Sequence, residues 1–94
     1  MDQAPSKDIL KIVYSSEIER ILTRLKKKDG VLFREIENHI AKIIHEPLVG
    51  KPLRYAMKNR RRVHVGSFVL VYELHNSELR FLDFDHHDRI YKKK

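Results

Sequence analysis

Residues 51–74 read KPLRYAMKNRRRVHVGSFVLVYEL and join a cationic segment to a strand-forming one. The first half, residues 51–62, carries six Lys or Arg side chains and no acidic one. The second half is rich in Val, Leu, Phe and Tyr, as β-strands are, and is interrupted only at Gly66-Ser67. A β-surface that begins in a concentrated cationic patch suits the phosphate backbone of a nucleic acid. The stretch therefore predicts a small sheet with a polyanion-binding edge.

The turn signals of this region predict a meander of antiparallel strands. Gly66-Ser67 matches a two-residue reversal with glycine first, and residues 75–77 form the next turn. Because side chains alternate along a strand, Arg62 and His64 should share one face, opposite to the valines that flank His64. An extended segment begins near Leu53. The expected strands cover about residues 61–65, 68–74 and 78–85.

Two amphipathic helices are predicted upstream of these strands. Ser16 and Glu19 fit a capping box that starts the first helix, and Gly30 is expected to end it. The second helix should run from about residue 31 to residue 45, where Pro47 closes it. The apolar stripes that predict the two helices are Ile18, Ile21, Leu22 and Leu25, then Phe33, Ile36, Ile40, Ile43 and Ile44.

The order of these elements predicts an α+β fold. A short strand at about residues 8–14 precedes the helices, and the Asp29-Gly30 turn makes them an antiparallel hairpin. Each helix has one apolar face, which needs a flat apolar surface to cover. We expect an N-terminal strand and a two-helix hairpin packed on a three- to four-stranded antiparallel sheet. Residues 1–94 would form a single domain, with residues 1–6 as a disordered leader.

The charge of the chain is distributed unevenly. The net charge is +7 over 94 residues, and residues 51–94 contain eleven Lys or Arg against five Asp or Glu. This asymmetry indicates a polyanionic partner, and a solubilising surface is the simpler alternative. The absence of cysteine excludes disulfides, a thiolate nucleophile and cysteine-ligated zinc. The sequence shows neither an apolar run of membrane-spanning length nor a signal-peptide pattern, so we expect a soluble cytoplasmic protein.

Four short segments resemble sequence blocks of the RelE/ParE superfamily, the toxins of toxin–antitoxin systems. They are GKPL at residues 50–53, RVHVG at 62–66, VY at 71–72 and RIYK at 89–92. Their order and spacing are similar to those of the family, and the resemblance spans about residues 8–92. It implies two helices wrapped against a twisted antiparallel sheet and a cognate antitoxin that silences the toxin. RelE-like members cut messenger RNA in the ribosomal A site, whereas ParE-like members poison DNA gyrase.

The resemblance implies a RelE-like toxin that inhibits translation by cleaving ribosome-bound mRNA without a metal ion or small-molecule cofactor. In RelE-like cleavage the 2′-hydroxyl attacks its neighbouring phosphate, which needs a base, cations and an acid. An imidazole titrates at about pH 6.5 and suits acid–base catalysis. The catalytic residues implied by the family positions are Arg62, His64, His87 and Tyr91. The residues expected to bind nucleic acid are Arg54, Lys58, Arg60, Arg61 and Arg80.

One position departs from the family pattern. Val69 stands where the family has an arginine that faces the transition-state phosphate. Loss of such a contact would remove about 2.7 to 4 kcal/mol of stabilisation if it resembles an oxyanion-hole donor. Arg60, Arg61 or Arg80 could substitute for it. The alternatives are a ParE-like gyrase-binding toxin without nuclease activity, or a catalytically silent homologue that binds antitoxin or nucleic acid.

Several of these residues also have purely structural interpretations. The arginines could form a solvated strand end, His64 an ordinary polar position, and Tyr91 a packing residue. Tyr72 is expected in the core, and so are Phe68 and Phe84 rather than in a base-stacking platform with Tyr55. Residues 86–88 read HHD, but neighbouring side chains on an extended segment point to opposite faces, so no metal site is expected there.

Overall fold

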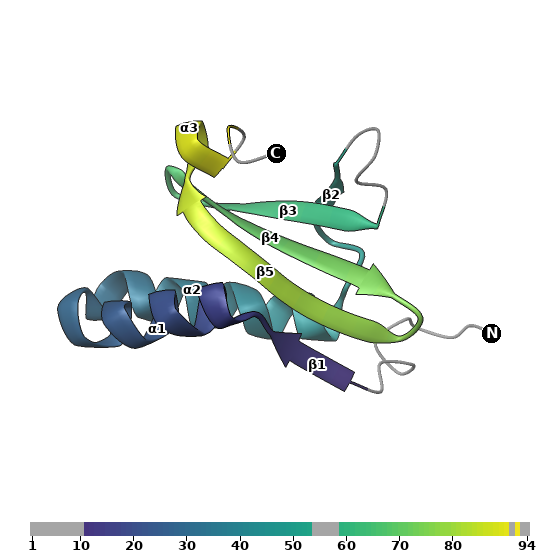
Figure 1. The fold of residues 1–94 in the computed structure, drawn as a ribbon, viewed down its shortest axis with the longest axis horizontal. Helices are drawn as coiled ribbons and strands as arrows, with labels where there is room; N and C mark the ends of the chain where they lie inside the picture. The colour runs from purple at the N-terminus through teal and green to yellow at the C-terminus, as the bar shows by residue number, and fades with distance from the viewer. Residues whose placement is uncertain (1–10, 54–58, 91, 93–94) are drawn as a thin grey trace.

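The fold is a helical hairpin packed on one face of a β-sheet (Figure 1). The structure, a computed structural model, describes residues 11–53, 59–90 and 92. The predicted leader at residues 1–6 lies outside these ranges. In chain order the elements are β1 (Lys11–Tyr14), α1 (Ser16–Lys28), α2 (Gly30–His45), β2 (Lys51–Pro52), β3 (Arg60–Val65), β4 (Phe68–His75), β5 (Glu78–His86) and α3 (His87–Ile90).

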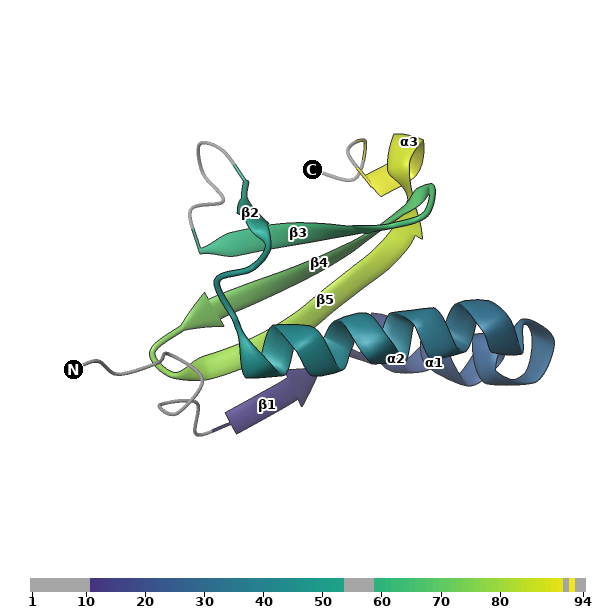
Figure 2. The same ribbon diagram turned by 180° about the vertical axis from the view of Figure 1, so that it is seen from behind.

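Within the described ranges the strands form one five-stranded sheet in the order β1-β5-β4-β3-β2. β3, β4 and β5 form the predicted antiparallel meander. The predicted α+β class is confirmed, but the sheet is mixed rather than purely antiparallel, because β1 pairs in parallel with β5. The helical hairpin carries the chain from β1 at one edge of the sheet to β2 at the other, as Figures 1 and 2 show. The parallel partners β1 and β5 are connected through both helices and the strands β2, β3 and β4, which satisfies the need of parallel strands for a long connection.

Two-residue turns join the strands of the meander where reversals were predicted. Gly66, which begins the turn between β3 and β4, has φ of +63°. The second turn consists of Asn76, with φ of 52°, and Ser77, with φ of 65°, so His75 belongs to β4. Positive φ at both central positions is typical of the type I′ turn, whose twist matches that of the flanking strands. The turn sets the register in which His75 lies opposite Glu78.

The first helix begins one residue earlier than predicted. Its N-cap is Ser15, whose hydroxyl accepts a 3.1 Å hydrogen bond from the N–H of Ile18. The predicted capping box of Ser16 and Glu19 is therefore wrong, and Ser16 is the first residue of α1. The Ser15 hydroxyl also donates a 2.7 Å hydrogen bond to the carbonyl of Leu82 in β5. This tertiary bond ties the start of α1 to the sheet.

Asp29 links the two helices. Its backbone N–H donates to the carbonyl of Leu25 at the end of α1, and its carboxylate accepts a 3.2 Å hydrogen bond from the N–H of Leu32 in α2. Gly30 was predicted to end the first helix, but it is the first residue of the second. One linking residue leaves the two helices antiparallel, as expected of a helical hairpin.

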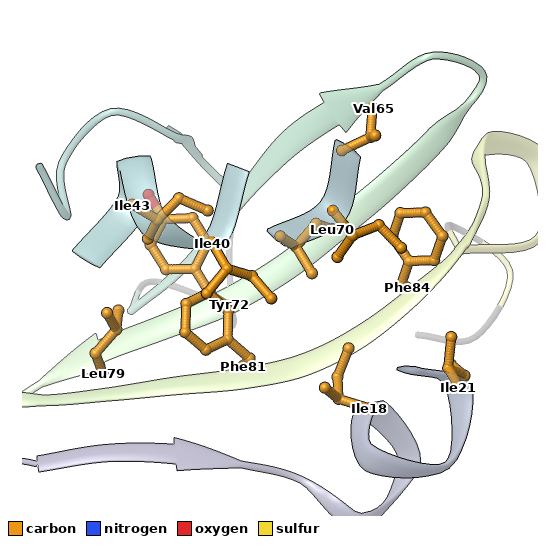
Figure 3. Packing of buried hydrophobic residues seen from close by; sticks show 11 residues of the cluster. Ile18, Ile21, Ile40, Ile43, Val65, Leu70, Tyr72, Leu79, Phe81 and Phe84 are labelled. Carbon is orange, nitrogen blue, oxygen red and sulfur yellow. The ribbon is translucent and has the colours of Figure 1, made fainter. Parts of the chain in front are cut away.

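The main core lies between the helical hairpin and the sheet. Figure 3 shows isoleucines of both helices around the aromatic rings of Tyr72 and Phe81. Tyr72 and Phe84 are buried in this core, and Phe68 is partly buried against it, so the prediction that these aromatic residues are structural is confirmed. The buried residues are Ile18, Ile21, Ile36, Ile40, Ile43, Val65, Leu70, Tyr72, Leu79, Phe81 and Phe84.

A smaller apolar cluster covers the opposite face of the sheet. Val69 and Val71 of β4 are buried there with Ile90 of α3, and Leu53 and Leu82 pack at the margins. The helical turn α3 was not predicted, because the strand-like pattern of β5 leads into it without a break. No helix in residues 11–53, 59–90 and 92 is long and apolar enough to span a membrane.

Candidate nucleic-acid interface

β3 presents basic side chains to the face of the sheet that carries Val69 and Val71. Arg62 lies opposite Val71 in the β3–β4 register, and His64 lies opposite Val69. The valines on either side of His64 pack in the main core on the other face. The predicted alternation along β3 is thus confirmed, and it places Arg60 on the same face as Arg62.

Two histidines from different elements meet at this face. The ring centroids of His64 and His87 are 5.6 Å apart, and the ring planes are inclined by 45°. His87 begins α3, and its backbone N–H donates a 2.9 Å hydrogen bond to the carbonyl of Ser67 in the β3–β4 turn. Both histidines are exposed. Because Arg62 and His64 are two residues apart on one strand face, roughly 7 Å separates their Cα atoms.

Other cations of the predicted set lie elsewhere. Arg61 is on the helix-facing side of β3, where its guanidinium donates hydrogen bonds to the carbonyls of Gly50 at 2.6 Å and Leu48 at 3.3 Å. It holds the loop that precedes β2. Arg80 is exposed on β5 and forms a 2.7 Å ion pair with Glu78. Neither residue lies beside the His64–His87 pair. Arg54, Lys58 and Tyr91 fall outside the described residues.

Carboxylates border the site on the side of α3. Asp85 lies opposite Val69 in the β4–β5 register and accepts a 3.0 Å hydrogen bond from Nε of Arg89. The Nδ1 atom of His87 is 3.6 Å from a carboxylate oxygen of Asp88. A phosphate would therefore meet the positive potential of this face mainly on the side of β3.

The two histidines of the HHD segment, His86 and His87, lie on opposite faces of the sheet and do not form a metal site together. The ring of His86 lies edge-on to Phe68, which packs against the main core, whereas the ring of His87 lies beside His64 on the other face. The two neighbouring histidines thus point to opposite sides, as expected for an extended segment. Among the described residues, no group of three or more His, Cys, Asp or Glu side chains is arranged to hold a metal ion.

Comparison with known proteins shows which family the chain belongs to. Residues 12–91 match the family model described as "ParE toxin of type II toxin-antitoxin system, parDE". The chain belongs to this family. A relative named "Putative toxin RelE4" from Methanocaldococcus jannaschii is 40% identical over 80 residues, which are 82% of this chain and 85% of the relative. The predicted membership of the RelE/ParE superfamily is therefore confirmed.

Solved structures share the fold of this ParE-family toxin. The YoeB/ParE toxin from Agrobacterium tumefaciens superimposes with a TM-score of 0.74 and 18% identity, covering 83% of this chain and 99% of that one. The match to the E. coli DinJ–YafQ toxin–antitoxin complex has a TM-score of 0.68 and 21% identity, covering 85% of this chain and 94% of that one. These likenesses show the fold and confirm its predicted RelE-like class.

Two positions of the predicted family pattern have clear structural settings in this ParE-family toxin. At Gly50 the chain passes so close to Tyr72 that no side chain fits. Burial raises the pKa of the Tyr72 hydroxyl, although its hydrogen bond from Gly50 and the charge of Arg61 offset part of that effect. At Val69 the expected arginine is replaced by a side chain that is 0% exposed in the cluster with Ile90. The floor of the site is therefore apolar.

The toxin also has basic residues near the site that the sequence did not single out. These are His39 and Lys42 of α2, which line a groove together with Arg62, His64 and Lys51, a residue of the predicted cationic segment. The three-residue spacing of His39 and Lys42 places them on the same side of a helix. That spacing alone does not reveal that this side of α2 faces the edge of β3.

Proposed function

We propose that this ParE-family toxin is an endoribonuclease that cleaves ribosome-bound mRNA by attack of a 2′-hydroxyl, without a metal ion. The observation that supports the proposal is the pairing of His64 and His87, whose ring centroids are 5.6 Å apart, on the face that carries Arg62. Two exposed imidazoles and the half-buried guanidinium of Arg62 on one face of the sheet provide the three groups that the reaction requires.

Each group has a defined role in the proposed reaction. One imidazole removes the proton of the 2′-hydroxyl, and the 2′-oxygen forms a bond to phosphorus. The other imidazole protonates the 5′-oxygen as its bond to phosphorus breaks, giving a cyclic 2′,3′-phosphate and a free 5′-hydroxyl. Arg62 stabilises the negative charge on the phosphorane through charge-assisted hydrogen bonds. Tyr91, implied by the family resemblance, remains a candidate for this set outside the described residues.

A ribosome-programmed cleavage assay tests the proposal. Arg62→Ala should lower the cleavage rate by about 10² to 10³ if its guanidinium stabilises the transition state. Arg24→Ala on α1 removes the same side chain from a distant helix and should cleave like the wild type. Equal cleavage by Arg62→Ala and wild type, or no cleavage by the wild type, would refute the proposed activity.

The proposed partner is a cognate antitoxin. The E. coli DinJ–YafQ structure shows a toxin–antitoxin complex on the same fold. In this chain, residues 51–94 hold eleven basic against five acidic side chains, which favours an acidic toxin-binding segment. The affinity should fall with added salt, because exposed charge contacts are screened. An affinity that does not change between low and high salt would indicate a mainly apolar interface instead.

A second candidate function is inhibition of DNA gyrase. It is favoured by Val69, since a toxin that binds a topoisomerase needs no arginine at that position, and by the ParE description of the matching family model. The measurement is gyrase supercoiling of relaxed plasmid DNA in the presence of excess toxin. Unchanged supercoiling would exclude this function.

A further inference from the structure

A groove lies where α2 faces the outer edge of β3, next to the proposed catalytic residues. Eight described residues line it, and none of them carries a carboxylate. The basic ones are His39, Lys42, Lys51, Arg62 and His64. Arg62 and His64 line the groove at the outer edge of β3 and also belong to the proposed site on the sheet face, so a chain bound in the groove would pass over this edge to reach the other surface.

The short length of β2 keeps this groove open. β2 pairs with Arg61 and Arg62 only, through Pro52 and Lys51. Beyond Arg62, in the part of the chain that the structure describes, the outer edge of β3 has no neighbouring strand. The groove therefore passes along an open backbone edge toward α2.

The groove combines cationic rims with an apolar floor. Lys42 of α2 and Lys51 of β2 line the groove together with the half-exposed Val49, which supplies apolar surface, whereas Ile43 is 1% exposed and supplies almost none. Nδ1 of His39 lies 2.8 Å from the carbonyl oxygen of Glu35 in the same helix. Because a carbonyl oxygen can only accept, Nδ1 carries the proton and donates this hydrogen bond. This bond fixes the orientation of the ring. Positive charge around apolar surface suits a nucleotide, whose phosphate is charged and whose base and ribose are partly apolar.

We propose that this groove is a second binding site for single-stranded RNA, in which Lys42 and Lys51 neutralise a backbone phosphate next to the scissile one. The proposal rests on the proposed nuclease function, because it assumes that the RNA contacts Arg62 and His64 in the catalytic site. It extends the RNA-contacting surface from the sheet to α2. An acidic peptide is the other ligand that such a groove could hold. RNA is favoured because the groove shares Arg62 and His64 with the proposed catalytic site.

The test is the salt dependence of RNA binding by the full chain. The probe is a short fluorescent oligouridylate with 2′-O-methyl riboses, which lacks the attacking hydroxyl and cannot be cleaved. The double variant Lys42→Gln/Lys51→Gln should bind about tenfold more weakly, and its plot of log affinity against log salt should be flatter by about 0.7 for each lost phosphate contact. The control Lys27→Gln/Lys28→Gln removes equal charge from exposed positions at the far end of α1 and should keep the wild-type slope.

The outcomes separate this proposal from the proposed activity. If the groove variant loses affinity and slope and the control does not, the RNA site stands, even if no variant cleaves ribosome-bound mRNA. If the wild type cleaves and the groove variant binds the probe as the control does, the RNA site is refuted while the nuclease stands. Unchanged RNA binding together with weakened binding of a polyglutamate peptide would assign the groove to an acidic protein segment and also refute the RNA site.

A kinetic measurement provides an independent check. A residue that binds RNA equally in the ground and transition states affects KM, whereas a catalytic residue affects kcat. The groove variant should therefore raise KM about tenfold for cleavage of ribosome-bound mRNA and leave kcat close to the wild-type value. A fall in kcat with unchanged KM would overturn the assignment of Lys42 and Lys51 as binding residues.

Discussion

The backbone N–H of Gly50 donates a 2.8 Å hydrogen bond to the hydroxyl of Tyr72, which in turn donates a 2.7 Å hydrogen bond to the carbonyl of Pro47. Both bonds are buried. They fix the loop between α2 and β2 against the sheet, in the register that places Lys51 opposite Arg62. The basic residues on the two sides of the groove are positioned by this link.

Gly50→Ala should destabilise the toxin. A Cβ atom at Gly50 would lie 2.6 Å from the hydroxyl oxygen of Tyr72 and 2.9 Å from the carbonyl oxygen of Arg62, both closer than van der Waals contact. Relief requires the loop to move, at a cost of about 1 to 3 kcal/mol in the free energy of unfolding. Urea denaturation measures it. Gly30→Ala is the control, since a Cβ at Gly30 meets no atom within 4 Å; equal stability of both variants would contradict the packing argument.

Tyr72→Phe tests the hydrogen bonds of the same loop without adding bulk. The variant leaves the N–H of Gly50 and the carbonyl of Pro47 without these bonds, so the free energy of unfolding should fall by about 1 to 3 kcal/mol. A loss below the error of urea denaturation would show that the loop is held by packing alone.

The Tyr72 hydroxyl also predicts a dependence on pH. Burial raises its pKa above the ordinary value of 10.0. Below the pKa that this hydroxyl has in the unfolded chain, the raised pKa has no effect on the pH dependence of the free energy of unfolding. As the pH rises from there through the folded-state pKa, the free energy of unfolding falls. Above about pH 10 the wild type should therefore lose stability faster than Tyr72→Phe, and the difference between them should shrink. Parallel curves of unfolding free energy against pH would contradict this.

Local sequence signals account for most of the fold. The isoleucine spacings, Gly66 and the turn before Glu78 predict the helices and the meander, because each pattern acts within a few residues. The parallel pairing of β1 with β5 could not be predicted in this way. It aligns Lys11 with Glu78, residues that are far apart in the sequence, and no local pattern specifies such a partner.

The candidate site was predictable in part. Alternation along β3 predicts that Arg62 and His64 share a face, and the same rule places Arg61 on the other face although it belongs to the same cationic segment. The contact of His64 with His87 depends on the position of His87, the first residue of α3, whose backbone N–H donates a hydrogen bond to the carbonyl of Ser67. That bond joins the β3–β4 turn to the start of α3, two segments that are apart in the sequence, so the sequence alone does not reveal it.

The His64–His87 pair should act as one catalytic unit. His64→Ala and His87→Ala should each lower kcat in the ribosome-programmed assay by about 10² to 10⁴, because each removes one proton-transfer group. The kcat of the double variant should be close to that of the less active single variant, because the effects of residues that act as a unit are not additive. His45→Ala, at the exposed end of α2, is the control and should retain wild-type kcat. Multiplicative losses in the double variant would show that the two rings act independently.

Val69→Arg should unfold the site rather than restore the arginine of the family pattern. Val69 is fully buried with Ile90, and the carboxylate of its cross-strand neighbour Asp85 is already paired with Arg89, so a guanidinium there would be desolvated at a cost of several kcal/mol. Val31→Arg makes the same replacement at a position that is 69% exposed and should leave the melting temperature unchanged. The thermal melts decide the stability, and the ribosome assay decides the activity. If Val69→Arg folds normally and cleaves faster than the wild type, the valine at position 69 lowers the activity of the toxin. The two histidines would then not compensate for the missing arginine.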